Sequence, residues 1–143
     1  MSAPDKPLLL DTHVWIWLSL GTPGAFTPAM QQRLNTGDRS RPLLVSFISA
    51  WEVAMLSAKG RLNLAMPTQA WIERSLAHPA MRFVSLEDPA IAVESNELPG
   101  DFHADPADRL LVATARVNGY VLVTRDQKIL DYGNAGHVNV LAA

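Results

Sequence analysis

Four acidic residues are placed along this sequence in a way that suits the binding of a divalent cation. Asp11 and Asp126 each follow a short apolar run of the kind that forms a buried strand. Glu52 and Asp108 fall in segments with helical periodicity, and we expect both in the first turn of a helix. Because the carboxyl ends of parallel strands meet at one edge of a sheet, all four carboxylates are expected in one crevice.

The chemistry of such a crevice follows from its charge. Crowded carboxylates repel one another and lose water, so they must take up protons or bind cations. Ligands that are all oxygen favour Mg²⁺, with Mn²⁺ able to substitute, over zinc. The candidate metal ligands and catalytic residues are therefore Asp11, Glu52, Asp108 and Asp126, with Thr124 as a candidate to orient them by hydrogen bonding. The sequence has no cysteine, which excludes disulfides, thiolate metal sites and cysteine nucleophiles.

Two of the acids also fit a purely structural role at the start of a helix. Ser49 and Glu52 have the spacing of a capping box, in which each side chain bonds the other's backbone amide. In Asp105-Pro106-Ala107-Asp108, Asp105 can cap a helix, Pro106 suits its first position and Asp108 is favoured by the helix dipole.

The other two acids have structural alternatives as well. Asp11 can cap a helix that starts near His13, and Asp126 can cap a short helix through Lys128 and Ile129. These roles do not explain why all four acids should face the same edge. The metal-site prediction therefore depends on convergence and not on any single motif. His13 and His103 lie near the acids, but isolated histidines are more often surface or loop residues.

The elements that must position these residues alternate along the chain. Short apolar runs alternate with segments of helical periodicity, which is typical of a parallel sheet covered by helices, an α/β fold. We expect strands at 8–10, 43–47, 83–86, 121–123 and 138–141, and helices at 28–35, from about Ser49 to Lys59, at 67–77, 89–97 and 106–118. Prolines near several helix starts, and glycines after Lys59 and Asn118, support these boundaries.

Length and composition favour one globular domain over residues 1–143. The 143 residues are 48% hydrophobic and 18% charged. No basic start precedes an apolar core, and no apolar run approaches the roughly 20 residues of a membrane helix, so we expect a cytoplasmic protein without a membrane partner.

Charge and motifs exclude further classes of function. The net charge of −2 argues against a nonspecific duplex-DNA binder. It argues less against a nuclease, because metal ions could neutralise the acids while local cations such as Arg125 contact phosphates. The glycine-rich dinucleotide fingerprint, the phosphate-binding P-loop and the nucleophile elbow are absent from the sequence, which makes hydride transfer and ATP hydrolysis poor hypotheses.

The ordered acidic motifs resemble the PIN-domain ribonucleases, and within them the VapC-type toxins of bacterial toxin–antitoxin pairs. The resemblance covers nearly the whole chain and is carried by four blocks: Leu8-Leu9-Leu10-Asp11-Thr12-His13, Ser46 through Glu52, His103 through Leu111, and Val123-Thr124-Arg125-Asp126. Ala107 departs from the pattern, because a bulkier aromatic is common there, but this removes no ligand.

The resemblance implies a three-layer α/β/α sandwich with a five-stranded parallel sheet and a magnesium-dependent endoribonuclease. It also implies that Asp11 and Asp108 would be the principal metal ligands and that Glu52 would complete or orient the shell of ligands around the metal. Asp126 would act directly or through water, and Thr124 would support them. It also implies an RNA substrate, a cognate antitoxin that covers the groove, and a homodimer. The segment from Trp15 to Leu18 either packs in the core or contacts the antitoxin.

Two other functions remain open at this point. A PIN-like nuclease for RNA maturation or DNA flaps would share the same site and differ in its substrate. A receiver-type module that is not a nuclease would also hold magnesium on an α/β sheet, with Asp11 and Asp88 as metal ligand and phosphate acceptor. The acid pair and the late lysine expected of such a module are missing from the sequence.

Overall fold

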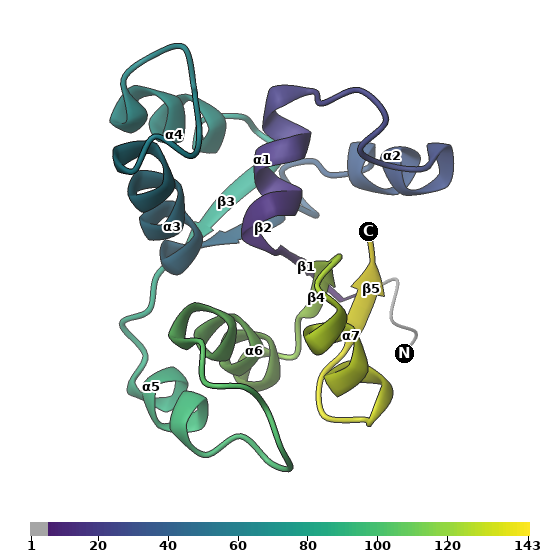
Figure 1. The fold of residues 1–143 in the computed structure, drawn as a ribbon. Coiled ribbons are helices and arrows are strands. Elements are labelled where there is room, and N and C mark those ends of the chain that lie inside the picture. The colour runs from purple at the N-terminus through teal and green to yellow at the C-terminus, as the bar shows by residue number, and fades with distance from the viewer. Residues whose placement is uncertain (1–5) are drawn as a thin grey trace.

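The computed structural model describes residues 6–143, which form a five-stranded sheet covered by helices (Figure 1). The strand order is β3-β2-β1-β4-β5 and every pairing is parallel, as predicted. The strands are β1 (Leu8–Leu10), β2 (Leu43–Ser46), β3 (Met81–Val84), β4 (Val121–Thr124) and β5 (Val140–Ala142). The helices are α1 (Thr12–Leu20), α2 (Pro28–Asn35), α3 (Phe47–Ala58), α4 (Thr68–Leu76), α5 (Pro89–Asn96), α6 (Pro106–Asn118) and α7 (Gln127–Asn134).

Apolar residues on both faces of the central strands create the three layers. Leu9 of β1 packs on the side of α6 and α7, whereas its neighbour Leu10 packs on the side of α1 to α4. Successive side chains of a strand point to opposite faces, so a strand buried on both sides must be apolar throughout. Figure 1 shows α1 to α4 on one side of the sheet and α5 to α7 on the other. The predicted α/β/α sandwich is therefore confirmed.

The strand order places a crevice beside β1. The chain runs outward from β1 to β2 and β3, then returns to build β4 and β5 on the other side of β1. Leu9 is consequently opposite both Leu44 and Leu122. Parallel sheets bind ligands outside the carboxyl ends of their strands at such a reversal. In this fold the residues just after β1, β2 and β4 are those that can meet there.

Some observed boundaries differ from those expected. The strand expected at 43–47 ends at Ser46, because Ser46 accepts a hydrogen bond from the Ile48 amide and starts α3 without an intervening loop. β3 lies earlier than expected, since its register is set by Met81 opposite Leu43. β5 starts at Val140, two residues later than expected. Within residues 6–143, no helix is both long and apolar enough to cross a membrane.

We predict that Gly133 is required for the packing of α7 against β5. A Cβ atom at Gly133 would lie 2.3 Å from Val140 Cγ2, far inside van der Waals contact. Gly133→Ala should therefore destabilise the protein by about 1–3 kcal/mol in urea unfolding. Val140→Ala makes room for the new methyl group, so the double variant should be more stable than the sum of the two single effects predicts. Strict additivity would contradict this steric explanation.

Candidate metal centre

All four predicted acids lie at one cleft of about 350 Å³ at the carboxyl edge of the sheet. They come from four different elements or element boundaries, after β1, within α3, at the start of α6 and after β4. The cleft is lined by Asp11, His13, Val14, Trp17, Glu52, Asp105, Asp108, Arg125 and Asp126. The convergence predicted from the sequence is therefore present, while the catalytic and metal-binding roles of these residues remain predictions.

Asp11 is held from two sides at the end of β1. One carboxylate oxygen accepts the Thr12 amide at 2.7 Å, which makes Asp11 the N-cap of α1 as the structural alternative proposed. The other oxygen accepts the hydroxyl of Thr124 at 2.6 Å. Thr124 is fully buried and comes from the neighbouring strand β4. Capping and cleft placement are thus compatible, because each carboxylate oxygen has more than one lone pair.

Glu52 reaches the cleft from the second turn of α3. The capping box expected from Ser49 and Glu52 is wrong, because Ser46 caps this helix and α3 begins at Phe47. The expectation that Glu52 lies in the first turn is wrong for the same reason. Glu52 instead accepts the hydroxyl of Thr12 at 2.5 Å, and that hydroxyl also lies 2.9 Å from Ser49 Oγ. Thr12 therefore connects α1 to α3 at the cleft.

Asp108 lies in the first turn of α6, as predicted. Asp105 caps this helix through the Ala107 amide at 3.3 Å, and Pro106 occupies the first helical position. The sequence reading assigned Asp105 a capping role alone, yet it also lines the cleft. The position of Asp105, just before a helix that starts at the carboxyl edge of the sheet, could have indicated that it lines the cleft.

Asp126 caps α7 and joins the same network. Its carboxylate accepts the amides of Lys128 at 2.8 Å and Ile129 at 3.3 Å, as the structural alternative predicted. Its own amide donates to the Thr124 hydroxyl at 3.0 Å. Since that hydroxyl also bonds Asp11, Thr124 connects the two acids that follow β1 and β4.

Burial and mutual repulsion raise the pKa values of three of these acids, Asp11, Glu52 and Asp108. For Asp11 and Glu52 the main cause is desolvation, which hydrogen bonds from Thr124 and Thr12 respectively oppose. Desolvation is also the main cause for Asp108, followed by the charges of the neighbouring carboxylates, and together they raise its pKa to about 7. The cleft therefore favours any ligand that brings positive charge.

The donor chemistry of the cleft fits a hard divalent cation. Every acidic side chain in the cleft is an oxygen donor, and desolvation together with the neighbouring negative charges raises the pKa of Asp108. Among residues 6–143, no three acidic, histidine or cysteine side chains are already gathered in metal-binding geometry. Mg²⁺ does not require such a cage, because it usually keeps several waters and takes only one or two carboxylates directly.

One wall of the cleft combines an aromatic ring with a cation. Trp15 is fully buried, whereas Trp17 is partly buried, packs against the same core and also lines the cleft. The guanidinium of Arg125 lies 4.4 Å from the Trp17 ring centroid. Arg125 also donates to the carbonyls of Ala25 and Ala143. A positive group is thereby fixed beside the acids.

The receiver-type alternative does not agree with the structure. A receiver domain has the strand order 2-1-3-4-5, whereas this sheet has the order 3-2-1-4-5. Asp88, the proposed phosphate acceptor, caps α5 through the Ala90 amide and is not among the residues that line the acidic cleft. That interpretation was therefore wrong.

Comparison with known proteins agrees with the fold. Residues 8–135 match the model of the PIN domain. Ribonuclease VapC22 of Mycobacterium tuberculosis is 35% identical over 133 residues, which cover 93% of this chain and 97% of the relative.

Solved structures of lower identity share the fold. DNA-bound VapBC from Salmonella typhimurium matches with a TM-score of 0.68 at 15% identity, covering 96% of this chain and 98% of the other. A toxin–antitoxin complex from Klebsiella pneumoniae matches with a TM-score of 0.59 at 21% identity, covering 94% of this chain and 95% of the other. From the family match and the mycobacterial relative together, the chain belongs to the PIN domain family and is a relative of the VapC ribonucleases.

Proposed function

We propose that this protein is a magnesium-dependent endoribonuclease that acts in the cytoplasm as the toxin of a toxin–antitoxin pair. The observation that carries the proposal is the cleft in which five carboxylates meet and the pKa of Asp108 rises to about 7. The relative named as a ribonuclease supports the reaction class. The structural neighbours named as toxin–antitoxin complexes support the biological role.

Four of the five acids have a proposed part in the reaction. Asp11 and Asp108 are the principal ligands for Mg²⁺, with Mn²⁺ able to substitute. Glu52 completes or orients the ligand shell, and Asp126 acts directly or through a water molecule. When bound, Mg²⁺ supplies activation of the attacking water and stabilisation of the departing 3′ oxygen. Thr124 holds the Asp11 carboxylate in place through its 2.6 Å hydrogen bond. The products then carry a 5′ phosphate, and the 2′ hydroxyl is not required.

The RNA backbone must approach a cleft that is itself acidic. Arg125 is the fixed cation on its wall, held against Trp17 and against two backbone carbonyls. A guanidinium with a prearranged orientation is suited to a phosphate of the substrate. We therefore assign Arg125 to backbone contact, next to the carboxylates that hold the cation.

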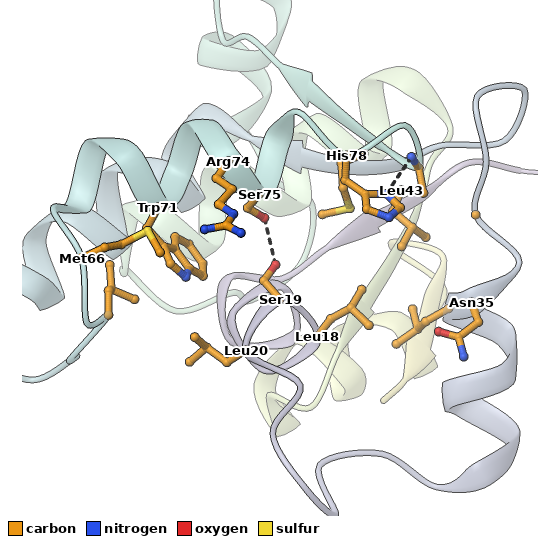
Figure 2. Close-up of a pocket in the computed structure, with 15 residues that line it drawn as sticks. Leu18, Ser19, Leu20, Asn35, Leu43, Met66, Trp71, Arg74, Ser75 and His78 are labelled. Atoms are coloured by element: carbon orange, nitrogen blue, oxygen red, sulfur yellow. Dashed lines mark hydrogen bonds between the residues drawn. The ribbon is translucent and has the colours of Figure 1, made fainter.

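A surface suited to binding the antitoxin lies on the same side of the sheet as α1. A groove of about 730 Å³ lies between α1, α2 and α4, and Figure 2 shows Leu18 and Leu20 on one side and Trp71 and Arg74 on the other. Leu20 is 44% exposed although it is apolar. Grooves lined by exposed apolar side chains bind amphipathic partner segments.

Helix α1 connects this groove to the acidic cleft. Its first turn carries His13 in the cleft, and its last turn carries Leu18 and Leu20 in the groove. Nine helical residues span only about 14 Å. One partner segment in the groove can therefore extend a basic side chain to the carboxylates, which restrains the nuclease by neutralising its cation site.

A homodimer is also part of the proposal. Phe47, Trp51 and Phe83 are all exposed by 43% or more, and the rings of Phe47 and Phe83 lie 6.3 Å apart. These residues come from α3 and the edge strand β3, and none of the three lines the groove. An exposed aromatic surface of this kind is suited to burial against a second copy.

Asp11→Asn is expected to abolish most RNA cleavage while the fold remains intact. The substitution removes a charge from the cation site but keeps the side-chain shape and an acceptor for Thr124. Activity on structured RNA in Mg²⁺ should fall by at least about 100-fold, because even supporting groups around a metal are worth roughly 10–100-fold. Circular dichroism and thermal unfolding check the fold. If the variant retained Mg²⁺-dependent cleavage, the assignment of Asp11 would be wrong.

Stability without divalent metal should fall as the pH rises from about 5 to about 8. The pKa of Asp108 is raised from 3.8 to about 7 in the folded protein. Its contribution to the free energy of unfolding is therefore fully present below its pKa in the unfolded chain and is lost as the pH rises through 7. Asp11 and Glu52 act in the same direction. The melting temperature measured in EDTA should show this slope, and Asp108→Asn should reduce it.

Magnesium should raise the melting temperature more at the upper end of this range, because protons compete with the cation for the carboxylates. Asp38→Asn is the control for the pH dependence measured in EDTA. The pKa of Asp38 is lowered by hydrogen bonds from Ser40 and Arg41, so the stabilisation that Asp38 provides is lost only at acidic pH. A melting temperature that is flat with pH in EDTA would contradict the proposed electrostatic origin.

Leu20→Lys should weaken antitoxin binding by at least about 10-fold, or about 1.4 kcal/mol. Lysine places a charge in the apolar groove and cannot pair with Arg74, which has the same charge. The candidate partner is the product of an adjacent short reading frame, and calorimetry measures its affinity. Val93→Lys is the matched control, since Val93 is 55% exposed and lies outside the groove. Equal affinities for the two variants would place the antitoxin elsewhere.

A further inference from the structure

His103 lies just before α6 with one ring nitrogen already engaged. Its Nδ1 accepts the backbone amide of Asp105 at 3.4 Å. A neutral imidazole has one donor nitrogen and one acceptor nitrogen, so this contact leaves the proton on Nε2. The orientation of the ring therefore determines where a hydrogen-bond donor points.

That donor is directed toward Asp108. His103 Nε2 lies 3.0 Å from Asp108 Oδ2, and both side chains are largely buried. Within residues 6–143 the buried Nε2 makes no hydrogen bond of good geometry. The contact thus has the length of a hydrogen bond but not its direction, and a rotation of the Asp108 carboxylate completes it. A buried donor that is not used elsewhere is a costly feature unless it serves that carboxylate.

The backbone that carries His103 is held rigidly. Arg109, the residue after Asp108, donates to the carbonyls of Ser95 at 2.8 Å, Phe102 at 2.9 Å and His103 at 3.1 Å. The His103 ring also packs against that of Phe102, tilted by 45° with centroids 4.5 Å apart. Both the imidazole and the carboxylate are therefore anchored to the first turns of α6.

Phe102 is itself supported from α7. Its ring lies 4.8 Å from that of Tyr132, whose hydroxyl donates to the Pro99 carbonyl at 2.5 Å. The aromatic residues fix the plane of the imidazole, while Arg109 fixes its backbone. This much support is more than a surface histidine in a loop requires.

A comparison with the other acids shows what His103 supplies. The Asp11 carboxylate accepts the Thr124 hydroxyl, and the Glu52 carboxylate accepts the Thr12 hydroxyl. Asp126 accepts two backbone amides of α7. For Asp108, the corresponding side-chain donor is His103. Carboxylates that bind metal ions are commonly held by such outer donors.

We propose that His103 is a positioning residue for Asp108, whose Nε2–H group holds one carboxylate oxygen so that the other faces a divalent cation. This inference rests on the proposed metal-dependent nuclease and adds a residue to its site. His103 does not contact the cation or the RNA. Its effect is exerted through the orientation of the Asp108 carboxylate.

Two substitutions distinguish the contact of His103 with Asp108 from its contact with the Asp105 amide in the loop. In His103→Gln, the amide nitrogen can occupy the place of Nε2 and donate to Asp108. In His103→Asn, the shorter side chain reaches only the place of Nδ1, so it can keep the contact with the Asp105 amide but cannot reach Asp108. If the loop contact were the sole purpose of the histidine, Asn would be the better substitute.

The experiment measures Mn²⁺ binding by calorimetry and the Mg²⁺ dependence of RNA cleavage for the full chain and both variants. His103→Asn should bind Mn²⁺ about 10–100-fold more weakly than wild type, while His103→Gln should recover most of the loss. The Mg²⁺ concentration for half-maximal cleavage should shift in the same order. Thermal unfolding in EDTA verifies that both variants fold.

His78 provides a matched control, because its Nδ1 accepts the amide of Ala80 at 3.0 Å in the same local arrangement but away from the acidic cleft. His78→Asn and His78→Gln should leave Mn²⁺ binding unchanged. The inference is overturned if His103→Asn binds Mn²⁺ like wild type or better than His103→Gln. Wild-type protein without Mg²⁺-dependent cleavage would instead overturn the proposed function, and the order of the Mn²⁺ affinities would still decide the role of His103.

Discussion

The concentration of negative charge at the edge of the sheet is the constraint on which the arrangement of this protein depends. Burial and mutual repulsion both oppose ionisation of Asp11, Glu52 and Asp108, and they raise the pKa of Asp108 to about 7. Three of the five acids, Asp11, Asp105 and Asp126, are N-caps, so α1, α6 and α7 all begin at the cleft. The partial positive charge of a helix N-terminus favours a nearby anion. The helix N-termini thereby offset part of the repulsion between carboxylates that the fold brings together.

Most of the fold could be predicted from the sequence, because strands buried on both faces must be apolar and helices covering them must be amphipathic. The expected helix at 28–35 agrees with α2 residue for residue, since Thr27 and Pro28 mark its start. The start of α3 was missed because β2 passes into it without a loop, and Ser46 serves as both the last strand residue and the cap. No turn residue marks such a junction.

The acids of the candidate site could be predicted from the sequence, but the residues that hydrogen-bond to them were harder to predict. Acids that follow strands are visible in the sequence, but partners 40 or 113 residues apart are not: Thr12 reaches Glu52, and Thr124 reaches Asp11. Ser49 was assigned to a local cap because the capping-box spacing is a local pattern, whereas the folded chain uses it across two helices. Asp105 was assigned to a single role for the same reason. Tertiary contacts of this kind depend on the sheet order, which spacing alone does not determine.

The division of α1 between two surfaces has a consequence for how such a protein can diversify. Its early residues face the carboxylates and its late residues face the apolar groove, so the proposed sites of chemistry and of antitoxin recognition occupy opposite ends of one short helix. Substitutions at positions such as Leu20 alter what fits the groove without changing a single oxygen near the cation site. If the proposed function holds, a duplicated gene can acquire a new antitoxin through substitutions in the groove while it keeps the same acidic cleft. Two related toxins would then stop being inhibited by each other's antitoxins before either one loses activity.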